Sequence, residues 1–229
     1  MRSTLLLALT GCGTNTPTEE PLNVVVLVLD GARVDETFSD THTGLSGTTG
    51  ATLLPRIHSE LLPQGALVQP GYAHGITLTA PAHCDMLTGR RQSFANFANS
   101  SGPGAYLPVV PTLFEVLRDA EGLSESQLQL FGSSNLIEPL KHSLYPGMSG
   151  GAFYSINEDN AASDVAVLKR TRGIITESRP RLTVVNLHEV DRSGHYGTEA
   201  QYLENISDLD DAIMEFWGFL SALDGYAGR

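Results

Sequence analysis

The sequence has few cysteines, a shortage of basic residues and few long apolar runs, and each shortage excludes a class of protein. Only Cys12 and Cys84 occur among 229 residues, so no disulfide framework is expected. Fourteen Lys and Arg stand against 26 Asp and Glu, and the formal net charge of -12 disfavours nucleic acid as a partner. No apolar stretch approaches the ~20 residues that a transmembrane helix needs.

What is present fits one globular α/β domain, because 41% of the residues are hydrophobic and 17% are charged. Apolar runs predict buried strands, apolar residues at helical spacing predict helices, and the two alternate along the chain. The fold class expected is therefore α/β, a parallel sheet with right-handed crossovers and helices on both faces. The strands are expected at 24–29, 65–68, 127–131 and 182–187, and the helices at 53–62, 79–87, 111–118, 161–177 and 199–223. Loops or irregular structure are expected at 31–50, 93–107 and 133–158.

The N-terminal segment is predicted to lie outside the fold. Residues 1–12 combine Arg2, a leucine-rich run and Leu9-Thr10-Gly11-Cys12, which resembles a bacterial lipoprotein signal that is cleaved before a lipidated cysteine. Residues 13–22 are rich in Thr, Pro and Glu and are expected to form a flexible tether. Cys12 would then carry the lipid that attaches residues 23–229 to a membrane surface of the bacterial cell envelope.

Chemically active side chains follow the predicted strands. Asp30 ends the first apolar run, and Asp191 and His195 follow the run at 182–187. Ligands of open parallel sheets bind beyond the carboxyl ends of the strands, where these residues are expected. Thr79 is expected to be the N-cap of a helix, whose backbone N–H groups suit a tetrahedral oxyanion. Because a threonine hydroxyl is a weak nucleophile, it needs a neighbouring base or metal ion.

These motifs together resemble the alkaline phosphatase superfamily of phosphatases, phosphodiesterases, sulfatases and transferases. Leu29-Asp30-Gly31 is similar to the metal-binding end of its first strand, and Thr79-Ala80-Pro81-Ala82-His83 is similar to its nucleophile motif in the phosphodiesterase branch. The segment from Asp191 to His195 is similar to the one that supplies two ligands to the second metal. A threonine at position 79 argues against a sulfatase, which needs cysteine or serine there.

The resemblance implies a two-metal site, expected to hold zinc, with Asp30 and Thr79 at one ion and Asp191 and His195 at the other. Thr79 would attack a small phosphorylated substrate, a monoester or a diester, and water would release the product. Asn99, or the less well spaced Asn96, would bind a phosphoryl oxygen. His188 and Glu189 are expected to support the ligands and not to bind metal, and Cys84 to be a buried hydrophobe.

The family also needs a later Asp-His pair, and no histidine follows His195. The chain is therefore expected to be a C-terminally truncated phosphoric ester hydrolase, inactive as it stands because two-ligand sites bind zinc poorly. Two alternatives stay open: a non-catalytic surface lipoprotein module of the same fold, and a phosphoryl-group transferase acting on envelope lipids. The sequence leaves the substrate and the oligomeric state open.

Overall fold

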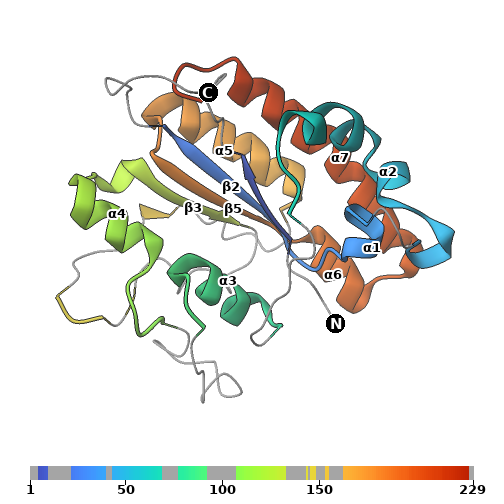
Figure 1. Ribbon diagram of the computed structural model, residues 1–229, viewed down its shortest axis with the longest axis horizontal. Helices are drawn as coiled ribbons and strands as arrows, with labels where there is room; N and C mark the ends of the chain where they lie inside the picture. Colours follow the sequence, from blue (N-terminus) through green and yellow to red (C-terminus); the bar gives the residue numbers. More distant parts are fainter. Residues whose placement is uncertain are drawn as a thin grey trace.

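The protein has an α/β fold in which a five-stranded sheet separates two layers of helices (Figure 1). The computed structural model describes residues 22–39, 43–68, 77–91, 107–132, 143, 145–147 and 162–226, together with the backbone of 5–9 and 153–154. Across the sheet the strands run in the order β1 (Leu5–Leu9), β2 (Val24–Leu29), β5 (Leu182–Leu187), β3 (Leu128–Gly132) and β4 (Phe153–Tyr154).

The centre of the sheet is parallel and buried on both faces. β2 pairs with β5 in parallel from Val24↔Leu182 to Leu29↔Leu187, and β3 continues the parallel sheet beyond β5. Continuous aliphatic runs such as that of β2 are typical of this environment, because neither face meets water. The equal register makes β2 and β5 end level with each other, so the residues that follow them share one edge of the sheet.

Helices cover both faces, as expected. Their bounds are α1 (Val34–Thr37), α2 (Gly50–Leu53), α3 (Thr79–Thr88), α4 (Leu113–Glu121), α5 (Asp164–Ser178), α6 (Glu189–Tyr196) and α7 (Glu199–Ser221). α5 and α7 lie on one side of the sheet, and α3 and α4 lie on the other (Figure 1). Each layer has its own apolar core: Leu27 and Leu29 of β2 pack in the first, and Val28 packs in the second with Cys84 of α3.

α7 confirms the predicted helix at 199–223 and its apolar stripe, with one shift. Tyr202, Ile206, Leu209, Ile213 and Leu220 are buried, whereas Phe216 takes the most buried place near the C-terminal end and Trp217 is only half-buried. Thr198 accepts a hydrogen bond from the backbone N–H of Gln201 and completes a capping box.

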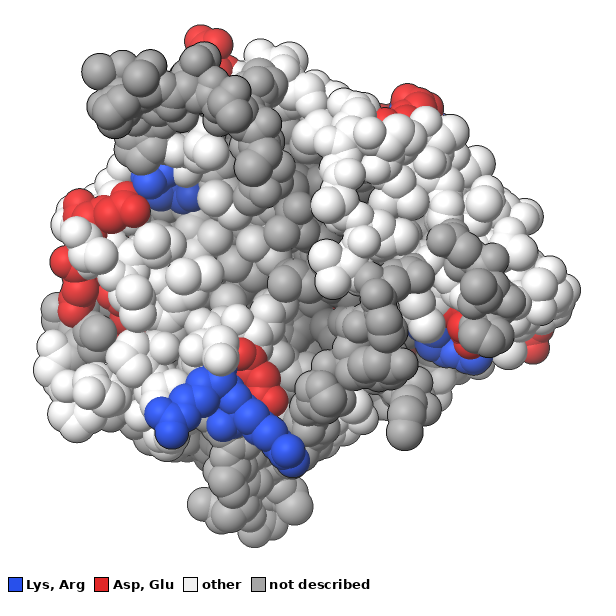
Figure 2. Space-filling view, viewed as in Figure 1, with Lys and Arg blue, Asp and Glu red and all other residues white. Residues whose placement is uncertain are grey.

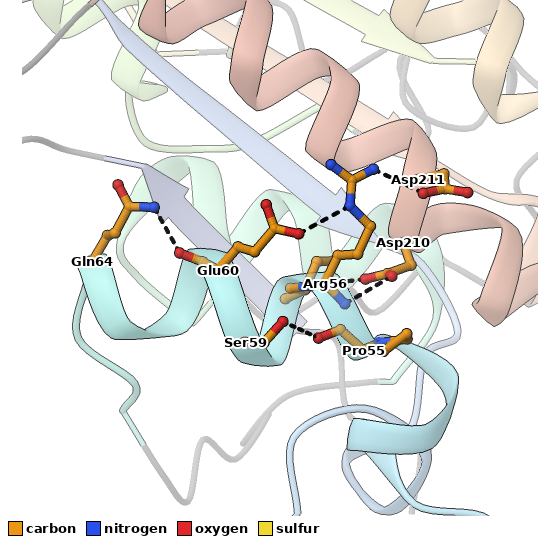
Figure 3. Close-up of polar contacts among 8 residues, drawn as sticks. Pro55, Arg56, Ser59, Glu60, Gln64, Asp210 and Asp211 are labelled. Carbon is orange, nitrogen blue, oxygen red and sulfur yellow. Dashed lines mark hydrogen bonds and ion pairs between the residues drawn. The ribbon is translucent and has the colours of Figure 1, made fainter.

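The helical segment at 55–64 is attached to α7 by a buried carboxylate (Figure 3). It contains a π-helix, η2 (Ile57–Leu61), and a 3-10 turn, η3 (Leu62–Gln64). Asp210 of α7 accepts hydrogen bonds from the backbone N–H of Arg56 at 2.9 Å and of Ile57 at 2.8 Å. These amides belong to the first turn, where helix donors have no partner within the helix. Asp210 therefore joins the two elements through a cap.

Several predicted loops and strands differ from the structure. The stretch at 31–50, expected to be a loop, contains α1 and the 3-10 helix η1 (Leu45–Gly47). Buried Glu36 of α1 accepts the backbone N–H of Leu45 at 2.9 Å and so joins the two helices. The strand expected at 65–68 is wrong: Leu67 and Val68 are exposed and irregular. β4 lies within the stretch expected to be irregular, at 133–158, and η5 (Glu125–Gln127) precedes β3.

Part of the N-terminal segment, residues 5–9, pairs with the sheet. Leu5–Leu9 forms β1, which pairs antiparallel to β2 with Leu5 opposite Leu29 and Leu9 opposite Val25. An unpaired edge on an apolar strand is unfavourable, and β1 covers the free edge of β2. Cys12 lies outside the described residues, so its lipidation stays a prediction. Among the described helices, none is long and apolar enough to cross a bilayer.

Candidate active site

The turn after β2 is the first part of the site. Asp30 directly follows the strand, is only 5% exposed, and donates its backbone N–H to the carbonyl of Leu187 at 2.9 Å. Gly31 adopts a φ of +73°, and a Cβ at that position would lie 2.5 Å from the Cα of Asp191. Only glycine fits both the left-handed backbone and this close approach. Gly31 therefore brings the end of β2 into contact with Asp191, a predicted ligand of the second metal ion.

The turn is also held from α7. The hydroxyl of Tyr202 donates to the carbonyl of Gly31 at 3.1 Å and accepts the backbone N–H of Arg33 at 3.2 Å. Tyr202 itself is buried. Its ring packs in the apolar core, and its hydroxyl binds the backbone next to Asp30. Tyrosine suits this place because it joins an apolar ring to a polar hydroxyl.

α6 carries the second pair of predicted ligands. Asp191 and His195 lie four residues apart on this helix and therefore share a face, with His195 Nε2 3.5 Å from Asp191 Oδ1. The His195 side chain is 42% exposed and that of Asp191 is 20% exposed, so both can be reached from solvent. Figure 1 shows α6 beside the end of β2.

The start of α6 is clamped to the start of α5. The carboxylate of Asp164 accepts the backbone N–H of His188 at 2.8 Å and of Glu189 at 3.1 Å. In return, the Glu189 carboxylate accepts the backbone N–H of Asp164 at 2.7 Å. Each helix thus receives its cap from the other, which supports the expectation that Glu189 has a structural role.

Two buried or half-buried side chains near this clamp, Asp164 and His188, have shifted pKa values. Burial, reinforced by the charges of Glu189 and Asp30, raises the pKa of Asp164 to about 7 against the two backbone hydrogen bonds that lower it. Burial also lowers the pKa of His188, whose charged form Asp30 and Asp191 would favour. The His188 side chain therefore interacts electrostatically with both predicted ligand carboxylates, Asp30 and Asp191.

α3 presents Thr79 from the opposite layer. The helix is confirmed, but the expectation that Thr79 is its N-cap is wrong: Leu78 is the extended N-cap residue and Thr79 is the first residue of the helix. No side chain caps this helix start in the described residues, and Pro81 contributes no N–H. The half-buried Thr79 therefore lies beside backbone donors that a bound oxyanion could use.

A chain of buried polar side chains joins Thr79 to Asp30. His83 Nδ1 lies 2.8 Å from the carbonyl oxygen of Thr79, and His83 Nε2 lies 3.0 Å from Asn186 Oδ1. Asn186 Nδ2 donates to Asp30 Oδ2 at 3.4 Å, a long hydrogen bond. His83 comes from α3, Asn186 from β5 and Asp30 from the end of β2, so three elements meet at this edge of the sheet.

A cavity of about 370 Å³ opens beside Asp191. Its lining includes Gly31, Arg33, Thr198 and Tyr202. Arg33 is paired with the buried carboxylate of Glu36 at 3.3 Å, so its charge is already partly compensated. Asp191 is the predicted ligand that lines this cavity, which could receive a non-reacting part of a substrate.

The donors fit the predicted metal ions only in part. Carboxylates, imidazole and a hydroxyl are ligands that zinc accepts, and Asp191 and His195 already lie close together. Within the described parts of the chain, however, no three or more His, Cys, Asp or Glu side chains are grouped so that they could hold a metal ion. These residues supply two donors for each ion, fewer than the three or four that protein zinc sites use.

Two residues predicted to bind substrate lie in parts of the chain that the structure does not describe, and two residues of the site have roles that the sequence does not predict. Asn96 and Asn99 lie outside the described residues. Asn186 and the bridging role of His83 were not anticipated, although a polar residue within the buried run at 182–187 was a usable signal. Cys84 is buried in the core, as expected.

No protein-family model matches the sequence, and no curated protein matches it.

Proposed function

We propose that the protein is a phosphoric ester hydrolase with an alkaline-phosphatase-like fold, in which Thr79 is the nucleophile. The observation that carries this proposal is the meeting of three separate segments at the carboxyl edge of the sheet. Asp30 contacts the Thr79 helix through Asn186 and His83, and Gly31 packs against Asp191. The hydroxyl of Thr79, the carboxylates of Asp30 and Asp191 and the imidazole of His195 are the kinds of group that ester hydrolysis at phosphorus requires, and the segments that carry them meet at this edge.

In the proposed reaction the Thr79 oxygen forms a bond to phosphorus while the bond to the leaving oxygen breaks. The leaving group departs as an alcohol, having gained the proton that the Thr79 hydroxyl lost. Water then attacks the phosphorylated threonine and regenerates the hydroxyl with release of phosphate or a phosphate monoester. Backbone N–H groups at the uncapped start of α3 would bind the phosphoryl oxygens during both steps.

Asp30 and Thr79 would hold one zinc ion, and Asp191 and His195 the other. When bound, these ions would make the hydroxyl more acidic and neutralise the ester oxygens. The cavity lined by Gly31 and Arg33 would receive the leaving group, so a small phosphorylated molecule fits this arrangement as the substrate.

The charge distribution agrees with a small substrate better than with a nucleic acid. On the face drawn in Figure 2, basic side chains form small separate groups, each beside acidic side chains. Since backbone binding of nucleic acids depends on several phosphates being neutralised together, this face offers little for such binding. The attachment of the protein to the bacterial cell envelope through Cys12 remains part of the proposal.

The decisive test removes the nucleophile. Thr79→Ala should abolish hydrolysis of p-nitrophenyl phosphate and of bis-p-nitrophenyl phosphate by the zinc-loaded protein, because the variant lacks the hydroxyl that forms the bond to phosphorus. Thr112→Ala is the matched control: it removes a threonine that caps α4, which should cost about 1 kcal/mol of stability and leave turnover intact. Full activity of the Thr79 variant would overturn the assignment.

A second candidate is a non-catalytic module of the same fold. It is favoured by the lack of any three-residue donor group for a metal in the described residues. The two candidates separate in the same assay, because a non-catalytic module turns over neither ester at any zinc concentration.

A further inference from the structure

The link between His83 and Asn186 is buried more completely than any other polar contact of the site. Asn186 is 0% exposed and His83 is 1% exposed. Burying polar groups costs free energy unless they are hydrogen-bonded. Asn186 has a partner at each amide atom, and His83 has an acceptor oxygen at each ring nitrogen, of which a neutral imidazole can donate to one. An apolar pair of similar volume would fill the same space without that requirement. Packing alone therefore does not explain why His83 and Asn186 are polar.

Apolar contacts alone leave the position of α3 loosely defined. α3 packs on the sheet through Cys84 and Leu87, which contact the core formed with Val28 and Val184. Hydrophobic contacts are non-directional, so they tolerate sliding or rotation of the helix by a fraction of a turn. Hydrogen bonds constrain both distance and angle. The contact between His83 Nε2 and Asn186 Oδ1 is a directional link between α3 and β5.

This link ends on the two groups whose separation matters most for the proposed reaction. His83 Nδ1 contacts the carbonyl of Thr79 itself, and Asn186 donates to the carboxylate of Asp30. A movement of α3 along the sheet would thus break the bridge before it changed the apolar contacts greatly.

We propose that His83 and Asn186 are positioning residues that hold the Thr79 hydroxyl at a defined distance from Asp30. This inference rests on the proposed function for its catalytic consequence. The bridge itself can be measured without turnover. Neither side chain is assigned contact with the substrate.

The test uses His83→Leu and Asn186→Leu, which keep bulk and remove the hydrogen bonds, in the full-length chain. Hydrogen exchange should report local opening of the first turn of α3, with the rate at Ala82, whose N–H donates to the carbonyl of Leu78 at 3.0 Å, rising about 10-fold or more while rates near Leu87 stay unchanged. In the zinc-loaded protein, kcat should fall by about 10- to 100-fold with little change in KM, because the nucleophile is misplaced. The double variant should lose no more than either single one, since both remove the same link.

Leu87→Ala is the matched control, because it weakens the packing of the same helix and leaves the bridge intact. It should lower stability without increasing exchange selectively at Ala82. At temperatures where this variant is folded, its kcat should equal that of the wild type. His83→Gln, which keeps one donor and one acceptor, should restore part of the lost kcat. It also serves as the folded variant if leucine is not tolerated at position 83.

The outcomes are distinguishable. Unchanged exchange at the start of α3 in both bridge variants would overturn the inference, whatever the activity. Increased exchange together with a wild-type kcat would overturn the positioning role and leave the proposed function standing. If the wild-type chain itself turns over no phosphate ester, the proposed function fails, and the exchange measurements alone decide whether the bridge holds Thr79 in place.

Discussion

At the residue scale, Gly31 has the most demanding position in the site. Its positive φ and the 2.5 Å approach to Asp191 are separate constraints. Gly89 at the end of α3 also has a positive φ, +61°, but a Cβ there would meet nothing within 4 Å. The two glycines therefore allow the backbone cost to be separated from the cost of the contact.

Gly89→Ala should destabilise the protein by about 1–2 kcal/mol, the usual cost of a left-handed conformation for a residue with a Cβ. Gly31→Ala should cost more, because the new methyl group must also push Asp191 and α6 away. Urea denaturation of both variants measures the difference in the free energy of unfolding. Equal losses would show that the close approach is absent in solution.

Asp164 predicts an unusual pH dependence. Its pKa is raised from 3.8 to about 7 by burial, so between these values the folded chain retains a proton that the unfolded chain releases. The stabilising contribution of this group is thus fully present below pH ~4 and is lost as the pH rises through ~7.

Asp164→Asn keeps the shape and one acceptor oxygen but cannot ionise. Between pH 8 and pH 5, the wild type should gain about 2–3 kcal/mol of stability relative to this variant, because one pKa unit corresponds to 1.36 kcal/mol. Chemical denaturation at the two pH values measures this gain. A stability difference between the two proteins that does not vary with pH would contradict the raised pKa.

At the scale of elements, helices are held by caps that come from other helices. α5 and α6 cap each other through Asp164 and Glu189, and Asp210 of α7 caps the helix at 55–64. Sequence reasoning finds local caps such as the box of Thr198 and Gln201, because these depend on spacing along the chain. It does not find caps whose donor and acceptor are distant in the sequence, 24 or 25 residues apart between α5 and α6 and more than 150 residues apart for Asp210.

Asp210→Ala should lower the free energy of unfolding by about 2–3 kcal/mol, since two buried amides lose a charged acceptor. The neighbouring Asp211→Ala is the control, because this exposed carboxylate only pairs with the side chain of Arg56 (Figure 3). It should change the unfolding midpoint little. Similar midpoints for the two variants would show that the cap contributes nothing.

The strand β1 shows how an element can take a place that the sequence does not predict. Its leucine-rich run is typical of a cleaved signal, and the same apolar character suits a strand that pairs with the edge of β2. Both interpretations depend on hydrophobicity, which does not distinguish a segment inserted in a membrane from one paired in a sheet.

At the scale of the whole molecule, metal binding should be coupled to folding. If the proposed ligands hold zinc in the folded state only, saturating zinc at about 100 times its Kd should add about 2.7 kcal/mol of stability per site. Asp30→Asn and Asp191→Asn should each reduce this gain and the number of zinc ions bound, whereas Asp211→Asn should not. Calorimetric melting with and without EDTA measures the gain. An unchanged melting temperature would count against both sites.

The sequence by itself determined the α/β class, the central strands 24–29 and 182–187, and the helices that begin at Thr79 and Glu199, because the spacing of apolar residues is a property of neighbouring positions. It also indicated which residues follow the strands. Only the tertiary structure decided that Gly31 meets Asp191, that Asn186 bridges His83 and Asp30, and that Asp164 and Asp210 cap distant helices. These contacts join residues far apart in the chain, and their geometry exists only once the sheet and both helical layers have packed together.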